Sequence, residues 1–265
     1  MENPGKGGLL ASLLKGYRPE GIEKSFKMTV GSLLSDRFLF GIHKADISPA
    51  DLLSVCARMG MPEIFIASLR TNAEEANAFH FGFEGTPGGG VYKIYLEFAG
   101  RLANARPAAP GSEGVLLHLA YKWDALDASI RTIAQYRCWP QLPEAAVQSR
   151  VAALYANDAD SVALKGISDL IGLSTARAGT APMYLEVREE GNPRASCDLN
   201  LHHAGIGLAE AGPWLSRLRK HYSIADEAFL PVYEAARQST LGHVSGGTNR
   251  NGEDFVTVYY AAEGI

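Results

Sequence analysis

The stretch Gly90-Val91-Tyr92-Lys93-Ile94-Tyr95-Leu96-Glu97-Phe98 predicts a β-strand whose two faces differ in chemistry. Side chains along a strand point alternately to opposite faces, with a period of two residues. One face of this strand is therefore apolar and suits a packed core. The other face presents three functional side chains in a row, namely Lys93, Tyr95 and Glu97.

The composition is that of a globular protein with one large domain or two small ones. The chain has 265 residues, of which 46% are hydrophobic and 20% are charged, so it can bury a substantial core. The formal net charge of -4 lacks the basic excess typical of nucleic-acid-binding proteins, and we expect no nucleic-acid partner. No run of about 18 apolar residues occurs, so we expect no membrane-spanning helix.

The cysteines and short motifs do not identify a reaction by themselves. Cys56, Cys138 and Cys197 are scattered and lack CxxC spacing, which predicts buried free thiols in a reducing cytoplasm. The chain has no GxGxxG, Walker, HExxH or DDxxD sequence. We therefore predict no metal-ligating residues.

Pairs of strands alternate with helices along the rest of the chain. Ser48 is a good N-cap before Pro49, which predicts a helix that Gly60 ends. Strands are then predicted over residues 63–70 and 77–85, ahead of the strand quoted above. Further strands are expected over residues 115–124, 130–139, 182–190, 194–203, 241–249 and 253–262, and further helices near residues 143–155, 161–175, 213–222 and 226–238.

This order of elements predicts an α+β fold built on a large antiparallel sheet. Strand pairs separated by helices do not give the parallel, doubly wound sheet of alternating strands and helices. About ten strands is close to the number at which an antiparallel sheet closes. We therefore predict a single domain over residues 28–265, a roughly ten-stranded barrel with helices outside in repeating α-β-β-α order. Residues 1–27 would form a separate N-terminal segment.

The polar faces of these strands carry cations, phenols and imidazoles that would converge inside a closed barrel. On an open sheet the same residues would simply face water, and that interpretation remains open. The side chains placed on the polar face are Arg70, His80, Lys93, Tyr95, His118, Lys122, Arg137, Tyr184, Arg188, Asn200, His202, His243 and Tyr259. His202 and His203 would point to opposite faces, so we expect Asp198 to hydrogen-bond His202 instead of a metal site there.

The predicted architecture resembles the soluble aromatic prenyltransferases of the ABBA type, and Lys93-Ile94-Tyr95 matches the Lys-x-Tyr strand motif of that family. The resemblance implies a transferase that moves a prenyl group from an allylic diphosphate to an aromatic small molecule. In that family, basic residues hold the diphosphate and tyrosines shield the allyl cation. The substrate-binding candidates on the polar face are Arg70, Lys93, Tyr95, His118, Lys122, Arg137, Tyr184, Arg188 and Tyr259.

The residue types suit this chemistry. Charge-assisted hydrogen bonds hold phosphate oxygens strongly, and electron-rich rings attract a cation. Glu84 or Glu97 could act as the catalytic base that removes a proton from the acceptor. Glu97 and Glu186 could instead neutralise Lys93 and Arg188 in ion pairs. We expect no cofactor, with Mg2+ as the one candidate.

The same residues also suit a second class of function. The same cavity would suit a non-catalytic binding or accessory protein whose ligand is an anionic or aromatic small molecule.

Overall fold

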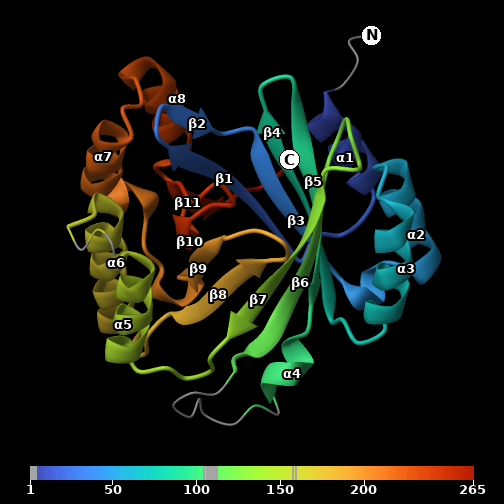
Figure 1. Ribbon diagram of the computed structural model, residues 1–265, viewed down its shortest axis with the longest axis horizontal. Helices are drawn as coiled ribbons and strands as arrows, with labels where there is room; N and C mark the ends of the chain where they lie inside the picture. Colours follow the sequence, from blue (N-terminus) through green and yellow to red (C-terminus); the bar gives the residue numbers. More distant parts are fainter. Residues whose placement is uncertain (1–4, 104, 106–112, 157, 159) are drawn as a thin grey trace.

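The computed structural model forms a closed antiparallel barrel with helices outside it (Figure 1). It describes residues 5–103, 105, 113–156, 158 and 160–265. The barrel strands are β1 (Gly21–Thr29), β3 (Arg37–His43), β4 (Ala78–Thr86), β5 (Gly89–Glu97), β6 (Val115–Asp124), β7 (Arg131–Cys138), β8 (Met183–Glu189), β9 (Ala195–Asn200), β10 (Leu241–Thr248) and β11 (Asp254–Ala261). The predicted α+β barrel is confirmed.

The barrel closes where its first strand pairs with its last. From β3 to β11 each strand pairs with the next one along the chain, and β1 pairs with both β3 and β11. The β1–β11 register runs from Glu23 opposite Ala261 to Met28 opposite Val256. The short strand β2 (Ser32–Leu34) pairs only with the end of β1 and lies outside this ring.

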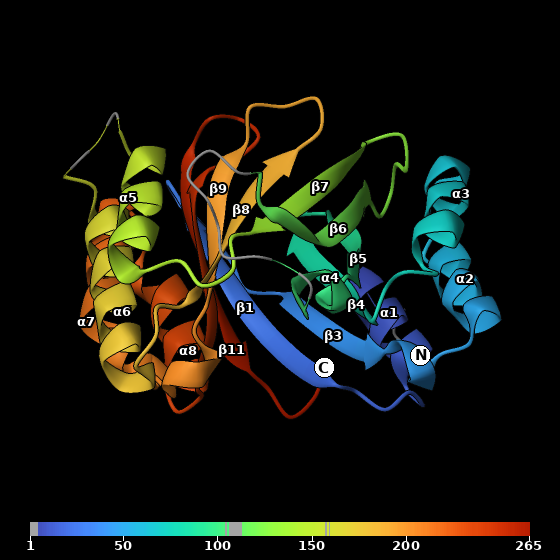
Figure 2. The ribbon, with the colours of Figure 1, turned by 90° about the horizontal axis from the view of Figure 1, so that it is seen from below.

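The helices cover the barrel in two groups on opposite sides, as Figure 2 shows. One group contains α1 (Lys6–Leu14), α2 (Pro49–Arg58) and α3 (Glu63–Asn72), and the other contains α5 (Glu144–Leu154), α6 (Val162–Ala178), α7 (Gly212–His221) and α8 (Asp226–Ala236). The short helix α4 (Ala99–Ala103) follows β5. Single 3-10 turns, η1 (Lys44–Asp46), η2 (His202–Ala204) and η3 (Leu208–Ala211), complete the elements.

Two apolar cores fill the spaces between the barrel and these helix groups. On the side of α2 and α3, the outward residues Ile94 and Leu96 of β5 are fully buried in the same core as Phe65. On the other side, Leu199 and Val244 are buried in one core with helix residues such as Ile167. Because the helices cover the outer face of the sheet, the inner face of the strands is left to line a lumen.

Local sequence signals explain the first helices. Ser48 accepts a 3.1 Å hydrogen bond from the amide of Asp51, so α2 begins at Pro49 as predicted. Residues 63–70, however, form helix α3 and the predicted strand is wrong. Phe65, Ile66 and Leu69 are the buried residues there, and this spacing fits one face of a helix.

Three other expectations concern the chain as a whole. The boundary expected between residues 27 and 28 falls inside β1, and residues 1–4 lie outside the described part. Cys56, Cys138 and Cys197 are free and buried. Within the described residues, no helix combines the length and the apolar character needed to cross a membrane.

The contact between α6 and α7 yields a stability test. A Cβ atom on Gly166 of α6 would lie 1.9 Å from Nε1 of Trp214, an indole that donates a hydrogen bond to the carbonyl of Val162. We predict that Gly166→Ala lowers the free energy of unfolding by about 1–3 kcal/mol in urea denaturation, because the indole must shift.

Gly172 on the same helix is the matched control. Its nearest neighbour to an added Cβ is Glu144 Oε1 at 3.7 Å. Gly172→Ala should therefore raise stability by about 0.4–1 kcal/mol, because it reduces the freedom of the unfolded chain. Equal effects of the two substitutions would contradict the packing argument.

Candidate functional site

The lumen is arranged in layers that can be followed along β5. Lys93, Tyr95 and Glu97 all point inward, and their neighbours Ile94 and Leu96 are buried in the outer core. Alternate residues of a strand are about 6.6 Å apart, so each of these side chains lies in a different layer. Lys93 belongs to a basic compartment, Tyr95 to a ring of phenols, and Glu97 to a larger cavity.

One half of the basic compartment is organised around Glu84. Its carboxylate contacts Arg37 Nη1 at 2.5 Å, pairs with the ammonium of Lys93, and lies 4.0 Å from that of Lys27. Burial alone would raise the pKa of Glu84, but Arg37 and Lys93 hold it well below its usual value. Burial lowers the pKa of Lys93 to about 8 against the opposing influence of Glu84. Glu84 is therefore an ionised partner of cations, which makes it a poor acceptor of protons.

The other half is organised around Glu189. Oε1 of this carboxylate lies 2.7 Å from Lys122 Nζ and 2.8 Å from Arg194 Nη1. Burial alone would raise the pKa of Glu189, but the neighbouring cations lower it. Burial and Arg194 together hold the pKa of Lys122 well below its usual value.

Basic residues outnumber acidic ones in this compartment. The second cavity of the barrel, about 30 Å³ in volume, is lined by Glu84 and by the five basic residues Lys27, Arg37, Lys93, Lys122 and Arg194. Among the described residues, Glu84 and Glu189 are the two carboxylates that pair with these cations. The compartment therefore attracts anions, although the free space holds about one water molecule.

Three tyrosines separate this compartment from a larger cavity. Tyr95, Tyr136 and Tyr259 line both spaces. The rings of Tyr95 and Tyr136 meet edge to face, with centroids 5.6 Å apart. Burial raises the pKa of all three phenols, so they remain neutral and present aromatic faces and hydroxyl groups to the lumen.

The larger cavity has a volume of about 740 Å³, within the usual range for a small-molecule site. Part of its wall is apolar, with Leu117 and Leu185 buried and Met183 packed against them. Ala99 and Leu102 of α4 also line it. The rest of the wall carries two groups of ionisable side chains.

The first group contains His80, Glu97 and His118. His80 Nε2 lies 2.7 Å from Glu97 Oε2. The hydrogen bond from His80 lowers the pKa of Glu97, while burial works in the opposite direction. Burial lowers the pKa of His118 to about 3, so this imidazole is neutral. Glu97 is thus an ionised carboxylate at the wall of the cavity, with His80 to orient it.

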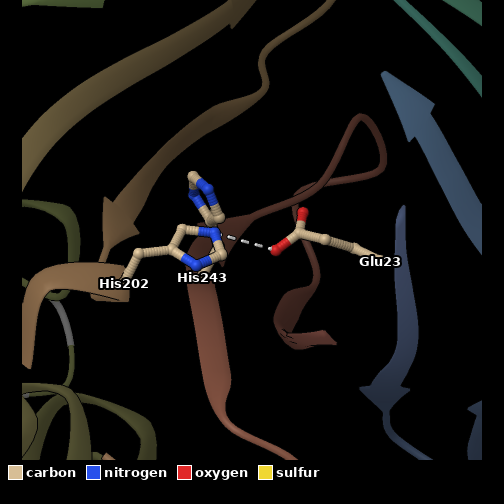
Figure 3. A group of neighbouring side chains, drawn as sticks. All are labelled: Glu23, His202 and His243. Atoms are coloured by element: carbon tan, nitrogen blue, oxygen red, sulfur yellow. Dashed lines mark ion pairs between the residues drawn. The ribbon is translucent and has the colours of Figure 1, made fainter. Parts of the chain in front are cut away.

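The second group contains Glu23, His202 and His243 (Figure 3). Asp198 Oδ1 lies 2.6 Å from His243 Nδ1, and the predicted pairing of Asp198 with His202 is therefore wrong. Strand β9 ends at Asn200, so His202 lies on η2. Its Nε2 is 3.2 Å from Glu23 Oε1. Burial alone would lower the pKa of His243, but Asp198 raises it to about 9.

The predicted polar face needs correction at four residues. Arg70 lies on α3, which is a helix outside the barrel. Tyr184 is buried against Trp139 under α5, and Arg188 is exposed beside Glu186. Arg137 also points out of the lumen and donates to the carbonyl of Gly114 at 2.9 Å. On β7 and β8 the lumen is lined by the alternate residues that were assigned to the outer face, such as Tyr136 and Leu185.

Several lumen residues were not among those predicted from the sequence. The missed residues are Glu23, Lys27, Arg37, Tyr136, Glu189 and Arg194. The alternation of Glu23, Ser25 and Lys27 in β1 was a usable signal. Tyr136 could have been found by testing the second phase of β7.

Comparison with known proteins identifies the fold. No family model and no curated protein matches the chain. A solved 6-dimethylallyl tryptophan synthase is 16% identical with a TM-score of 0.58, and the match covers 92% of this chain and 81% of that chain. A 5-dimethylallyltryptophan synthase from Streptomyces coelicolor is 12% identical with the same TM-score and coverage.

A third structure, AnaPT from Neosartorya fischeri, is 14% identical with a TM-score of 0.55, over 92% of this chain and 79% of that chain. The Streptomyces coelicolor enzyme has also been solved in complex with DMASPP and Trp. The chain therefore has the architecture of the ABBA-type aromatic prenyltransferases, as the sequence suggested.

The pairing around Glu84 generates a second stability test. Glu84→Gln would leave the buried cations Arg37 and Lys93 without their carboxylate. We predict a loss of about 3–5 kcal/mol in the free energy of unfolding at neutral pH, measured by urea denaturation.

Glu186→Gln is the control, because Glu186 pairs with Arg188 on the outside of the barrel. It should cost less than about 1 kcal/mol. A comparable loss in both variants would show that the Glu84 cluster has no special role in stability.

Proposed function

We propose that this protein transfers a prenyl group from an allylic diphosphate to an aromatic small molecule inside the barrel. The observation that carries the proposal is the position of Tyr95, Tyr136 and Tyr259 between a compartment with five basic residues and a cavity of about 740 Å³. The anionic leaving group would lie in the basic compartment, the carbocation beside the three tyrosines, and the aromatic acceptor in the larger cavity.

In this proposal the basic compartment binds the diphosphate. Arg37 and Lys93 would donate charge-assisted hydrogen bonds to its oxygens, together with Lys122. Because the free space there holds about one water molecule, Glu84 or the tyrosines must move when the diphosphate enters. The cations would offset its charge directly, so we propose that Mg2+ is not required.

The tyrosine layer would then stabilise the reacting group. The carbon–oxygen bond of the allylic diphosphate breaks, both electrons leave with the diphosphate, and the allyl cation remains beside Tyr95, Tyr136 and Tyr259. Each ring face contributes about 0.5–2 kcal/mol of cation–π attraction. The buried rings would also keep water away from the cation.

Glu97 is the base that we propose. The aromatic acceptor attacks the allyl cation, a carbon–carbon bond forms, and the ring then loses a proton. Glu97 lies at the wall of the cavity, ionised and hydrogen-bonded to His80. Glu84 is a weaker candidate, because its carboxylate is occupied by Arg37 and Lys93.

A non-catalytic role is the second candidate function. Glu84 and Glu189 already neutralise part of the basic compartment, and this favours a protein that binds an aromatic or anionic ligand in the larger cavity without chemistry. The two candidates differ in whether a prenyl diphosphate binds and is consumed.

The first test combines ligand binding with product detection. We expect dimethylallyl diphosphate to raise the melting temperature, and tryptophan or a phenol to yield a prenylated product detectable by mass spectrometry. Lys93→Ala and Lys122→Ala should each weaken diphosphate binding by about tenfold or more, since each removes a hydrogen-bond donor to the phosphate oxygens.

Arg188→Ala is the matched control, because Arg188 is exposed on the outside of β8. It should behave as the unsubstituted protein. The prenyltransferase proposal would be abandoned if the diphosphate neither shifted the melting temperature nor bound differently to the Lys93 and Lys122 variants. Binding without product across the acceptor panel would favour the non-catalytic role.

The low pKa of Lys93 predicts a pH dependence of diphosphate binding. The ammonium binds the anion and the neutral amine does not, so affinity should be highest below the pKa of about 8 and fall above it. Between about pH 7.5 and about pH 9.5, the affinity for the diphosphate should fall, approaching a tenfold loss per pH unit once Lys93 is deprotonated. Calorimetry measures this affinity.

Lys93→Arg keeps its charge throughout this range. The variant should bind the diphosphate with a flatter pH profile. An equally steep fall in Lys93→Arg would assign the dependence to another group.

A further inference from the structure

Two histidines and a glutamate meet at the wall of the larger cavity from three separate elements. Glu23 comes from β1, His202 from η2 and His243 from β10. One possible ligand atom of each lies within 4.8 Å of the other two, and the three side chains converge in Figure 3. We propose that these residues bind a divalent transition-metal ion.

His243 has one ring nitrogen held and the other free. Its Nδ1 lies 2.6 Å from Asp198 Oδ1, so Nε2 is the atom available to a metal. Binding there would replace the Nε2 proton, which leaves to solvent. A carboxylate that holds the far nitrogen of a histidine is the usual support of a metal ligand, because it fixes the tautomer and the ring orientation. Asp198 is therefore a positioning residue for His243 in this proposal.

Glu23 has a buried oxygen that lacks a hydrogen bond. Its Oε1 is buried and lies 3.2 Å from His202 Nε2, but the contact does not have hydrogen-bond geometry within the described part of the chain. An unsatisfied buried acceptor is costly. A metal ion bound between Glu23 and His202 would satisfy both atoms.

The backbone leaves room for this group at Gly242. A Cβ atom at this position would lie 2.1 Å from Glu23 Oε1 and 3.1 Å from His202 Nε2. Any other residue at position 242 would therefore displace both ligand atoms. The missing side chain creates the space in which they meet.

The donor set indicates the class of metal. Two imidazoles and one carboxylate suit Zn2+ or Fe2+, whereas Mg2+ prefers oxygen ligands alone. Metal–ligand distances of about 2.0–2.2 Å require the ligand atoms to approach one another to about 3.0–3.4 Å. His202 can make this movement, because its side chain is 43% exposed at the end of β9.

The remaining coordination positions would face the cavity, since all three residues line it. Three protein ligands with an open position are typical of a metal that also binds a small molecule. We expect an oxygen-bearing ligand at that position. The site does not depend on prenyl transfer, because no step proposed above uses these residues.

His80, Glu97 and His118 form a second possible ligand group in the same cavity. There His80 and Glu97 already satisfy each other through a 2.7 Å hydrogen bond. Each group has one buried atom without a hydrogen bond among the described residues, Glu23 Oε1 in the first and His118 Nδ1 in the second. The support of His243 by Asp198 favours the first group. Variants of both groups can distinguish them.

The test measures metal binding alone. The full chain, dialysed against a chelator, is titrated with Zn2+ in competition with a chromophoric chelator, and with Co2+ to follow visible absorption bands. We expect the chain to bind one Zn2+ ion tightly. His202→Ala and Glu23→Gln should each weaken the affinity for Zn2+ by more than about 100-fold, and Asp198→Asn should weaken it by about 10–100-fold.

His203→Ala is the matched control, because this exposed neighbour on η2 is not in the ligand group. His203→Ala and His118→Ala should both still bind one Zn2+ ion per chain. Circular dichroism should show the same fold in all variants. The proposal would be overturned if Zn2+ did not bind, if binding survived both His202→Ala and Glu23→Gln, or if His118→Ala alone abolished it.

Discussion

The pairing of β1 with β11 is the constraint on which the rest of the structure depends. It turns an antiparallel sheet into a ring, so every inward side chain must find its partners among other inward side chains. Buried charges are tolerated only when they are paired and hydrogen-bonded, which accounts for the positions of Glu84 and Glu189 among the cations. The closing strand β1 also contributes to both ends of the lumen, through Lys27 in the basic compartment and Glu23 in the cavity.

The spacing of residues along a strand gives the lumen its chemical order. Lys93, Tyr95 and Glu97 follow one another at alternate positions of β5, and each belongs to a different layer. A single strand thus carries the change from basic to aromatic to acidic surroundings. Glycines on neighbouring strands make room for the larger side chains, since a Cβ atom on Gly41 would lie 2.9 Å from Nδ1 of His80.

The sequence was sufficient for the barrel and for the polar face of β5, because strand alternation there matches an apolar outer core and a polar lumen. Alternation identifies two faces but does not say which one points inward. On β8 the lumen takes Leu185, while Tyr184 is buried under helix α5 and Arg188 is exposed outside. Residues 63–70 satisfied both a strand and a helix pattern, and tertiary packing against Tyr121 of β6 decided for the helix. The contribution of β1 depends on its partner at the other end of the chain, which local patterns cannot reveal.

Ring closure also has a consequence for the order of folding. The strands that join last in the ring are distant in sequence, and contacts between distant segments form late because a long loop must first be closed. During synthesis β11 emerges after all the other strands, so the lumen cannot seal until then. If β11 joins last, Arg37, Lys93 and Lys122 lose their water in that final step, with Glu84 and Glu189 on strands that pair with their chain neighbours.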